Sequence, residues 1–324
     1  MHAQAMVLRW AQRFLLWAAV LALAGCSTLI PQTVALRTGW PAGVPQQVEL
    51  AQVPFYPQEE YQCGPAALAM AMSFAGAPVR PDALVDEVWL PGRHGSLQLE
   101  MLAAPRRHDL VSYRLAPSYP DLLREVAGGH PVLVLQDVGM MLPEWHYAVV
   151  NGFDYDTGTI YLRSGLKARQ AMPFSYFERT WLAGQYWAMV VSAPEDIPRT
   201  ATESAWLESL LGFARGGDNP ATVRAYRAAL QRWPESLPAA VGLANHLHAA
   251  GSLPEAAGVL RTSLQQHPDS VILLNNLAQT LSDEGRQSEA LAVIRRAEDP
   301  NSPFANNVRE TRALIEQRLR QAGS

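Results

Sequence analysis

The sequence predicts an α+β domain followed by an all-α solenoid of repeats. Apolar residues at helical spacing dominate residues 63–127, and short β-branched or aromatic runs between Gly, Asp and Pro turns fill residues 130–192. Further along, Pro234 and Pro268 lie 34 residues apart and belong to a repeated pattern. Helices that precede an antiparallel sheet, with repeats behind them, give this two-part architecture.

Composition excludes several classes of protein. The chain has 324 residues, of which 48% are hydrophobic and 17% charged, and its formal net charge is −4. These values are typical of globular proteins with about two domains. With 26 Lys and Arg against 30 Asp and Glu, no basic block indicates a nucleic-acid partner. The two cysteines cannot form a disulfide framework, and the histidines lack metal-ligand spacing, so we expect no metal and no cofactor.

The amino terminus has the three parts of a secretory signal. Arg9 and Arg13 precede the apolar run 14–24, which is too short for a comfortable membrane span, and Cys26 follows small residues. The segment Leu-Ala-Gly-Cys resembles the lipobox of bacterial lipoproteins. This resemblance implies that residues 1–25 are removed, that Cys26 is lipidated, and that an outer membrane lipoprotein faces the periplasm. The alternative is an ordinary signal peptide with an incidental cysteine.

We expect four segments along the chain. The signal peptide covers residues 1–25, a lipidated tether rich in Pro and Gly covers 26–50, an α+β domain covers 51–195, and a repeat domain covers 196–324. A polar, proline-bearing stretch at 194–205 separates the two domains. In the first domain we expect helices at 63–75, 81–89, 96–107 and 119–127, and strands at 130–137, 145–153, 159–163 and 186–192, with a hairpin loop at 156–158.

The C-terminal repeat has further matches at the same offset. Leu243 and Leu277, Gly251 and Gly285, and other apolar pairs recur 34 residues apart. This period resembles the tetratricopeptide repeat, with a degenerate first unit around Trp206 and a capping helix over 304–324. The resemblance implies a groove that binds a segment of a protein partner. The alternative is a spacer or a self-dimerising element.

Three residues of the first domain have the chemistry of acyl transfer. Cys63 lies at the first turn of a predicted helix, where free backbone N–H groups and the helix dipole favour a thiolate. His146 begins a predicted strand and is expected to form an ion pair with that thiolate. Gln58 precedes Cys63 closely enough to place its amide N–H beside the backbone N–H of Cys63 as an oxyanion hole.

These residues stand in ordered motifs. QEEYQCGPAALA at 58–69 is followed by PVLVL at 131–135 and by HYAVVNGFD at 146–154. The order resembles the papain-like family of bacteriocin-processing, double-glycine leader peptidases, over about residues 52–192. The resemblance implies a papain-like fold, with Cys63 as nucleophile, His146 as general base and then acid, and Gln58 as oxyanion-hole donor.

Two positions depart from the family's pattern. The family places its Gln six residues before the Cys, whereas Gln58 is five residues away and Gln62 is a rival candidate. The family's Asp, which orients the histidine, falls on Arg163 and Ser164 in the sequence YLRSG. Ser164 can accept a hydrogen bond from the histidine ring, and Asp154 and Asn151 are the other candidates for orienting it. Arg163 either blocks the cleft or binds a substrate carboxylate.

The sequence therefore leads to one main hypothesis and two alternatives. The main hypothesis is a lipid-anchored cysteine peptidase that acts on a protein or peptide substrate, which its repeats recruit. The first alternative is peptidyl transfer to an amine, because a thioester does not dictate its acceptor. The second is a scaffold without catalysis, in which the peptidase-like cleft and the repeats both bind protein partners at the outer membrane.

Overall fold

The computed structural model describes residues 30–58, 62–93, 95–214 and 220–322. The chain divides into two compact units. The N-terminal unit comprises residues up to 102 together with 114–191 and 198–200, and the C-terminal unit comprises 103–113, 192–197 and 201–324. No helix in the described part of the chain combines the length and apolar character needed to cross a bilayer. The expected signal peptide and Cys26 lie outside the described residues.

The part of the chain before residue 201 contains both helices and strands. Its helices are α2 (Pro31–Thr38), α3 (Cys63–Phe74), α4 (Pro81–Val88), α5 (Gln98–Ala103), α6 (Tyr119–Ala127) and α7 (Phe174–Ala183). The strands are β1 (Gln47–Glu49), β2 (Trp89–Leu90), β3 (Gly95–Ser96), β4 (Val111–Arg114), β5 (Val132–Asp137), β6 (Trp145–Asp154), β7 (Thr159–Ser164), β8 (Lys167–Pro173) and β9 (Ala188–Ser192). Short 3-10 helices span Pro91–Arg93 and Ala104–His108.

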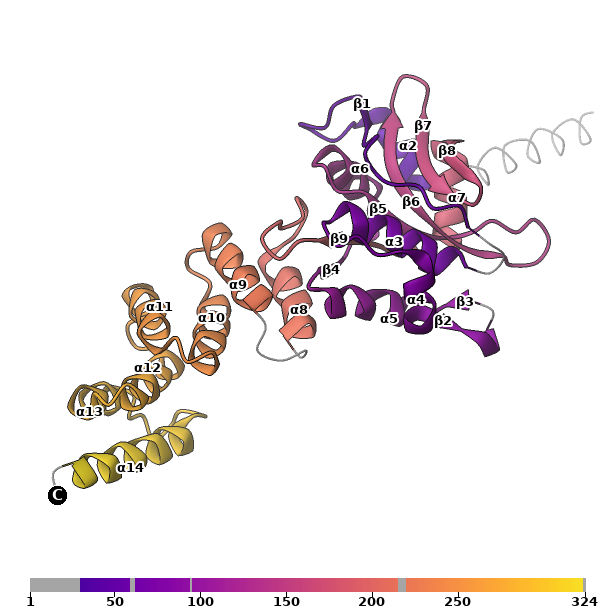
Figure 1. Ribbon diagram of the computed structural model, residues 1–324. Helices are drawn as coiled ribbons and strands as arrows, with labels where there is room; N and C mark the ends of the chain where they lie inside the picture. The colour runs from indigo at the N-terminus through magenta and orange to yellow at the C-terminus, as the bar shows by residue number, and fades with distance from the viewer. Residues whose placement is uncertain (1–29, 59–61, 94, 215–219, 323–324) are drawn as a thin grey trace, which may run out of the picture. The chain divides into compact units, whose positions relative to one another are not determined.

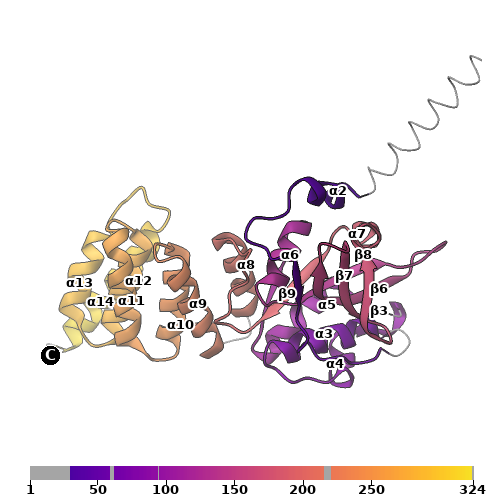
Figure 2. The ribbon, with the colours of Figure 1, turned by 90° about the horizontal axis from the view of Figure 1, so that it is seen from above.

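The main sheet has seven strands among the described residues, in the order β4-β9-β5-β6-β7-β8, with β1 added beside β6. The strands β5, β6, β7 and β8 pair as an antiparallel meander. In its register, His146 lies opposite Gln136 and Val149 lies opposite Arg163. Figure 2 shows this sheet between α3 and α4 on one side and α2, α6 and α7 on the other.

The core lies on both faces of the sheet. Helix α3 is buried along its length from Gly64 to Met72, and it contacts β5, β6 and β7. Nearly every residue of this helix is apolar, which suits a helix with no solvent-facing stripe. Aromatic side chains of α6 and α7 fill the other side, where Tyr119 and Trp181 are fully buried with ring centroids 5.9 Å apart. Helix α3 lies beside β6 in this core (Figure 1).

The segment expected as a tether is partly folded. Residues within 26–50 form α2 and β1, and β1 pairs with β6 from Gln47 opposite Asp154 to Glu49 opposite Gly152. The buried carboxylate of Glu178 accepts hydrogen bonds from the backbone N–H groups of Gln32 at 2.8 Å and Thr33 at 2.5 Å. A carboxylate at a helix N-terminus is favourable because it satisfies free N–H groups. The Pro and Gly content of this segment did not reveal these contacts.

Other differences concern weakly patterned elements. β8 at Lys167–Pro173 was not predicted, since it is an edge strand with mostly exposed side chains and no alternation of apolar residues. α7 was also missed, although Phe174, Phe177 and Trp181 recur at helical spacing. The helix expected at 96–107 ends at Ala103 and continues as a 3-10 helix that contains Pro105. The sequence patterns also did not indicate the α2–β1 segment, the strands β2, β3 and β4, or the 3-10 helix at Pro91–Arg93.

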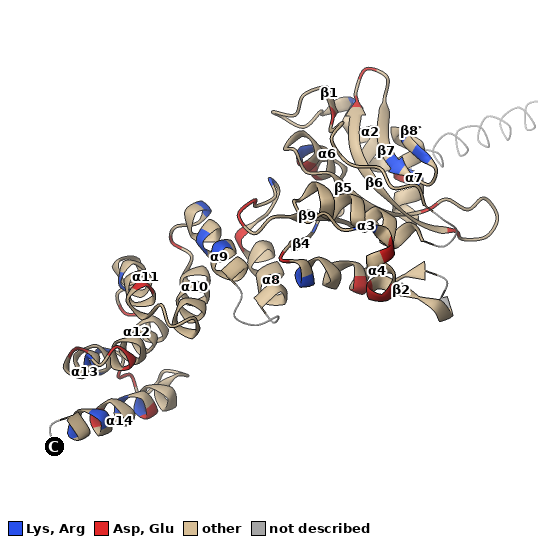
Figure 3. Ribbon diagram, in the orientation of Figure 1, with Lys and Arg blue, Asp and Glu red and all other residues tan. Residues whose placement is uncertain are grey.

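Beyond residue 201, every regular element among the described residues of the C-terminal unit is a helix. These helices are α8 (Glu203–Ala214), α9 (Pro220–Arg232), α10 (Leu237–Ala249), α11 (Leu253–Gln266), α12 (Val271–Asp283), α13 (Gln287–Arg296) and α14 (Ala305–Ala322). Ser236 and Ser270 accept the N-capping hydrogen bonds of α10 and α12 at equivalent repeat positions. Gly251 and Gly285 both have positive φ values, 76° and 81°, in the equivalent turns. Arg and Glu residues are interspersed along α14 (Figure 3).

Candidate active site

Cys63 is the first residue of α3 and is partly buried. Burial raises the pKa of its thiol, and backbone hydrogen bonds from Tyr147, Gly64 and Cys63 itself act in the opposite direction without overcoming it. The hydrogen bond from Tyr147 places the sulfur beside β6, one residue after His146. Gly64 allows α3 to lie close to β3, because a Cβ atom there would lie 2.2 Å from Ser96 Oγ.

His146 is the second residue of β6 and is partly buried. Its Nε2 atom lies 2.9 Å from the hydroxyl oxygen of Ser164, the last residue of β7. Burial lowers the pKa of His146. The second ring nitrogen, Nδ1, is the one that does not face Ser164.

Burial acts against the expected ion pair between Cys63 and His146. We expected a thiolate at the helix N-terminus that is stabilised by an imidazolium. Instead, burial raises the pKa of Cys63 and lowers the pKa of His146, so both groups favour their neutral forms. The carboxylate of Glu144 also raises the pKa of Cys63. Desolvation therefore outweighs the helix N-terminus in the resting site.

Gln58 is fixed by the turn between β7 and β8. Its backbone N–H donates to the carbonyl of Gly165 at 3.1 Å, and its side-chain Oε1 accepts from the Gly165 N–H at 3.1 Å. Its Nε2 donates to the carbonyl of Tyr147 at 3.4 Å. Gly165 has a φ of 57°, a conformation that favours glycine. One turn therefore carries both Ser164, which contacts His146, and Gly165, which holds Gln58.

The structure distinguishes the residues that the sequence left as alternatives around His146. Asn151 donates to the carbonyl of Leu50 at 3.4 Å, and Asp154 accepts from Gln47 and from the backbone of Thr157. Ser164 is the candidate that contacts the imidazole. The role of Ser164 in catalysis stays a prediction.

Arg163 neither lines the cleft nor presents its charge there. Its guanidinium is buried and donates to the backbone carbonyls of Val53 at 3.1 Å, Ala51 at 3.1 Å and Ala168. The bonds to Ala51 and Val53 connect the segment that precedes Gln58 with β7, the strand that ends at Ser164. Arg163 is thus a structural support of the site, and its guanidinium is engaged by the protein's own backbone.

A cavity of about 1040 Å³ joins the candidate residues. Gln58, Cys63 and His146 line it, whereas Gln62 does not and precedes α3 without a side-chain capping bond. Sequence reasoning missed the contributions of Glu144, Tyr147 and Gly165, although the Ser-Gly turn was a signal for the last. The other lining residues are Gly95, Ser96, Leu97, Gln98, Leu135, Pro143, Trp145, Ala183, Gly184 and Gln185.

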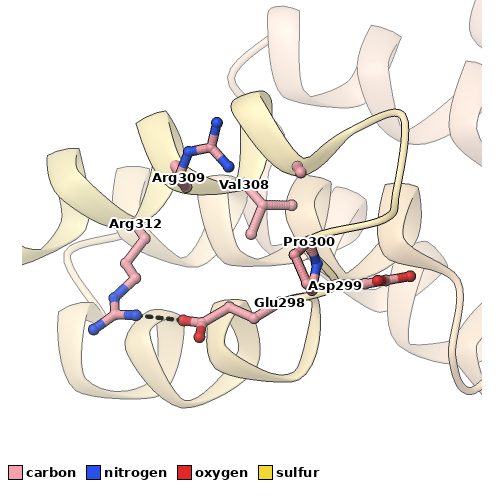
Figure 4. Close-up of a pocket in the computed structure, with 7 residues that line it drawn as sticks. Glu298, Asp299, Pro300, Val308, Arg309 and Arg312 are labelled. Carbon is pink, nitrogen blue, oxygen red and sulfur yellow. Dashed lines mark hydrogen bonds and ion pairs between the residues drawn. The ribbon is translucent and has the colours of Figure 1, made fainter.

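A second cavity, of about 200 Å³, lies in the C-terminal unit at the start of α14 (Figure 4). The Arg312 guanidinium forms an ion pair with the Glu298 carboxylate at its edge. Its described lining has charged and apolar side chains but no nucleophile next to a base. Among the described residues of either unit, no three His, Cys, Asp or Glu side chains gather in a way that could hold a metal ion.

Comparisons with known proteins match two parts of the chain to two families. Residues 50–189 match the Peptidase_C39-like family, and residues 211–271 and 254–306 match the tetratricopeptide repeat. The chain combines a C39-peptidase-like domain with tetratricopeptide repeats. The predicted fold class and the predicted family resemblance are therefore confirmed. The match does not extend to the catalytic roles of individual residues, which stay predictions.

Solved structures resemble each part of the chain. A structure described as a C39-like peptidase from Bacillus anthracis is 18% identical, with coverage of 48% of this chain and 100% of that chain and a TM-score of 0.40. The complex of the TPR2B domain of yeast Sti1 with pHsp70 is 20% identical, with coverage of 36% and 96% and a TM-score of 0.34. No curated protein matches the chain.

Proposed function

We propose that this protein is a cysteine peptidase that hydrolyses peptide bonds of a protein or peptide substrate. The observation that carries the proposal is the placement of Cys63, His146 and Gln58 in the lining of one cavity, within a C39-peptidase-like domain. A nucleophile, a base and an amide donor around one cleft are the groups that acyl transfer requires.

In the proposed first step, His146 takes the proton of the Cys63 thiol as the sulfur attacks the scissile carbonyl carbon. Nδ1 is assigned this role because Nε2 faces Ser164. The carbonyl oxygen becomes an oxyanion, which the Gln58 side-chain amide and the backbone N–H of Cys63 stabilise. The C–N bond then breaks, His146 gives its proton to the leaving amine, and an acyl thioester remains on Cys63.

In the second step, His146 removes a proton from water, and the hydroxide attacks the thioester carbonyl. Collapse of the tetrahedral intermediate releases the carboxylic acid and returns the proton to the Cys63 sulfur. Burial favours the neutral forms of Cys63 and His146. The proposed mechanism therefore transfers the thiol proton during the attack and does not begin from a preformed thiolate. The proposed mechanism thus resembles that of a serine peptidase, in which a histidine removes the proton of the hydroxyl nucleophile as it attacks.

The second candidate function is a peptidase-like cleft that binds polypeptide without cleaving it. Two observations favour it: the raised pKa of Cys63 and a serine, instead of a carboxylate or an amide, at His146. Loss of the orienting group in a related triad costs about 10⁴ in rate. The repeats supply an interaction module for either function.

A peptide-cleavage assay separates the two candidates. The full chain with Cys26→Ser has Cys63 as its one cysteine, and it is incubated with a library of 12-residue peptides that is then analysed by mass spectrometry. We expect defined cleavages that disappear in the additional Cys63→Ala variant and persist in a matched Ser73→Ala variant of α3. Equal cleavage by the Cys63→Ala variant would contradict the peptidase proposal, and binding without cleavage would favour the scaffold.

We also propose that Cys26 is lipidated and that the mature protein faces the periplasm at the outer membrane. The lipobox-like sequence supports this anchor, and α2 begins only a few residues after Cys26. Cys26→Ser is expected to move the protein from the membrane fraction to the soluble fraction, and retention in the membrane fraction would contradict the anchor.

The repeats are proposed to recruit the protein substrate or another protein partner. A stack of helix pairs buries a continuous core and leaves a groove for a polypeptide segment. The buried Leu277 and Ile294 belong to such a core. In a pull-down, substitutions at exposed positions of α8–α14 are expected to abolish capture of the partner. The same variants are expected to retain peptide cleavage by the N-terminal unit.

A further inference from the structure

Three consecutive large apolar side chains stand in solvent on the loop between β5 and β6. Met140, Met141 and Leu142 are 99%, 96% and 80% exposed, and we call them the apolar tip. Soluble proteins seldom expose contiguous apolar side chains without a binding role. Methionine is unbranched and polarizable, so it adapts to partners of varied shape.

The base of this loop is held by hydrogen bonds. The Asp137 carboxylate accepts from the backbone N–H of Gly139 at 3.0 Å and from that of Glu144 at 2.8 Å. The backbone N–H of Val138 also donates to the carbonyl of Glu144 at 2.9 Å. A Cβ atom on Gly139 would lie 1.9 Å from the carbonyl oxygen of Leu142, so the loop closes tightly at this point. The fold therefore presents the apolar tip outward on an ordered base.

The apolar tip is continuous with the candidate active site. Residues 143–147 follow it directly, and all of them line the cavity that contains Cys63. Other exposed apolar side chains lie in or next to the cavity lining: Trp145 at 54%, Leu166 at 80% beside Gly165, and Leu97 at 39%. Exposed apolar side chains therefore lie along the border of the cavity that contains Cys63.

We propose that the apolar tip binds large apolar side chains of an extended polypeptide substrate just outside the catalytic cavity. This inference rests on the proposed function of the cavity. Residues 138–143 contain no Lys or Arg, and the acidic Asp137 and Glu144 flank them. A loop that binds anionic lipid headgroups is expected to carry basic residues instead. The apolar tip thus selects sequence in the substrate, while the Cys63 region carries out the chemistry.

Peptide binding tests the proposal without requiring turnover. In the full chain with Cys26→Ser and Cys63→Ala, we measure the fluorescence anisotropy of two labelled 12-residue peptides, one rich in Leu and one in which Ser replaces each Leu. The Leu-rich peptide is expected to bind at least tenfold more tightly. Replacing Met140, Met141 and Leu142 by Ser is expected to remove that preference.

A matched control is Val34→Ser on α2, which is 41% exposed, belongs to the N-terminal unit and does not line the cavity. It is expected to keep the tenfold preference. Circular dichroism checks that each variant is folded, which is expected because the replaced side chains are exposed. Equal binding of the Leu-rich peptide by the tip variant and the unmodified chain would overturn the inference.

Two further measurements separate other occupants of the apolar tip. Loss of binding to phosphatidylglycerol vesicles in the tip variant, with peptide preference unchanged, overturns the inference in favour of a membrane. Loss of a dimer in sedimentation, with peptide preference unchanged, overturns it in favour of a second copy. Selective peptide binding without any cleavage by the Cys63-containing chain contradicts the proposed peptidase but leaves the docking role of the apolar tip supported.

Discussion

The imidazole of His146 contacts the hydroxyl of Ser164, with Nε2 and Oγ 2.9 Å apart. A serine hydroxyl both donates and accepts hydrogen bonds, so it does not select one tautomer of the ring. It also carries no charge to stabilise an imidazolium. In the proposed peptidase, Ser164 is therefore a weak orienting group for His146.

An amide at position 164 is predicted to improve the base. Ser164→Asn supplies a carbonyl oxygen that accepts from Nε2–H and leaves the Nδ1 lone pair free for the thiol proton. We expect kcat/KM for a cleaved peptide to rise at least about tenfold, within the range that tautomer control spans in related triads. Steady-state kinetics checks this, with Ser164→Ala as the matched variant that lowers kcat/KM. No gain in Ser164→Asn would show that orientation of His146 does not limit the rate.

The thiol of Cys63 is predicted to titrate above its ordinary pKa. Burial raises the pKa of Cys63, and the Glu144 carboxylate raises it further. Alkylation of Cys63 is therefore expected to increase only at alkaline pH, and Glu144→Gln is expected to move the midpoint to lower pH. The matched variant Asp156→Asn, in the exposed β6–β7 turn, is expected to leave it unchanged. A midpoint well below 8 in the unmodified chain would mean that a thiolate is preformed, contrary to the neutral pair.

Sequence patterns predicted the parts of the molecule with strong periodicity or dense motifs. The helix that begins at Cys63 is buried from Gly64 to Met72, and clear turns separate β5, β6 and β7. The spacing of apolar residues therefore predicted the positions of this helix and these strands. The charge state of the site did not follow, because the helix N-terminus favours a thiolate while burial disfavours it. Burial depends on packing by distant residues.

Residues that work through long-range contacts were also hidden. Arg163 binds carbonyls at Ala51 and Val53, more than one hundred positions earlier, and Glu178 caps a helix at Gln32. In each case the sequence shows a charged residue within an apolar stretch, but the hydrogen-bond partner of that residue is a backbone group. Backbone partners leave no signature in the sequence. The edge strand β8 was missed because it pairs with β7 alone, so most of its side chains are exposed and leave no apolar pattern.

Arg163 is predicted to support the fold of the site. Its three backbone hydrogen bonds make Arg163→Ala cost about 3 kcal/mol of unfolding free energy, because buried carbonyls lose their donors. Arg163→Lys is expected to recover little, since an ammonium cannot reproduce the guanidinium fork. Urea denaturation measures both. The matched variant Arg169→Ala, at an exposed ion pair with Glu49, is expected to lose much less. Unchanged stability in Arg163→Ala would refute this role.

The buried carboxylate of Glu125 is predicted to make stability depend on pH. Burial raises its pKa, but hydrogen bonds from His130 and Thr200 outweigh burial, and the net pKa lies below its ordinary value of 4.5. A lowered pKa stabilises the fold above about pH 4.5, and this contribution is lost as the pH falls through the pKa of the folded state.

Glu125→Gln tests this dependence directly. We expect it to lower the unfolding free energy by about 1–3 kcal/mol at pH 7, because a charged acceptor of several hydrogen bonds is lost. The difference from the unmodified chain is expected to shrink below pH 4.5. Urea denaturation from pH 7 to pH 3 measures it. A difference that stays constant over this range would contradict the assignment.

The most direct test of the account is the intact mass of the protein during exposure to a cleavable peptide library. The chain with Cys26→Ser is quenched in acid at short times and then digested to locate any adduct. The account predicts an acyl group on Cys63 that hydroxylamine removes and that is absent from the Cys63→Ala variant. Peptide cleavage that proceeds in the Cys63→Ala variant, or a chain that binds peptides and never acquires the adduct, would contradict the assignment of Cys63 as the nucleophile.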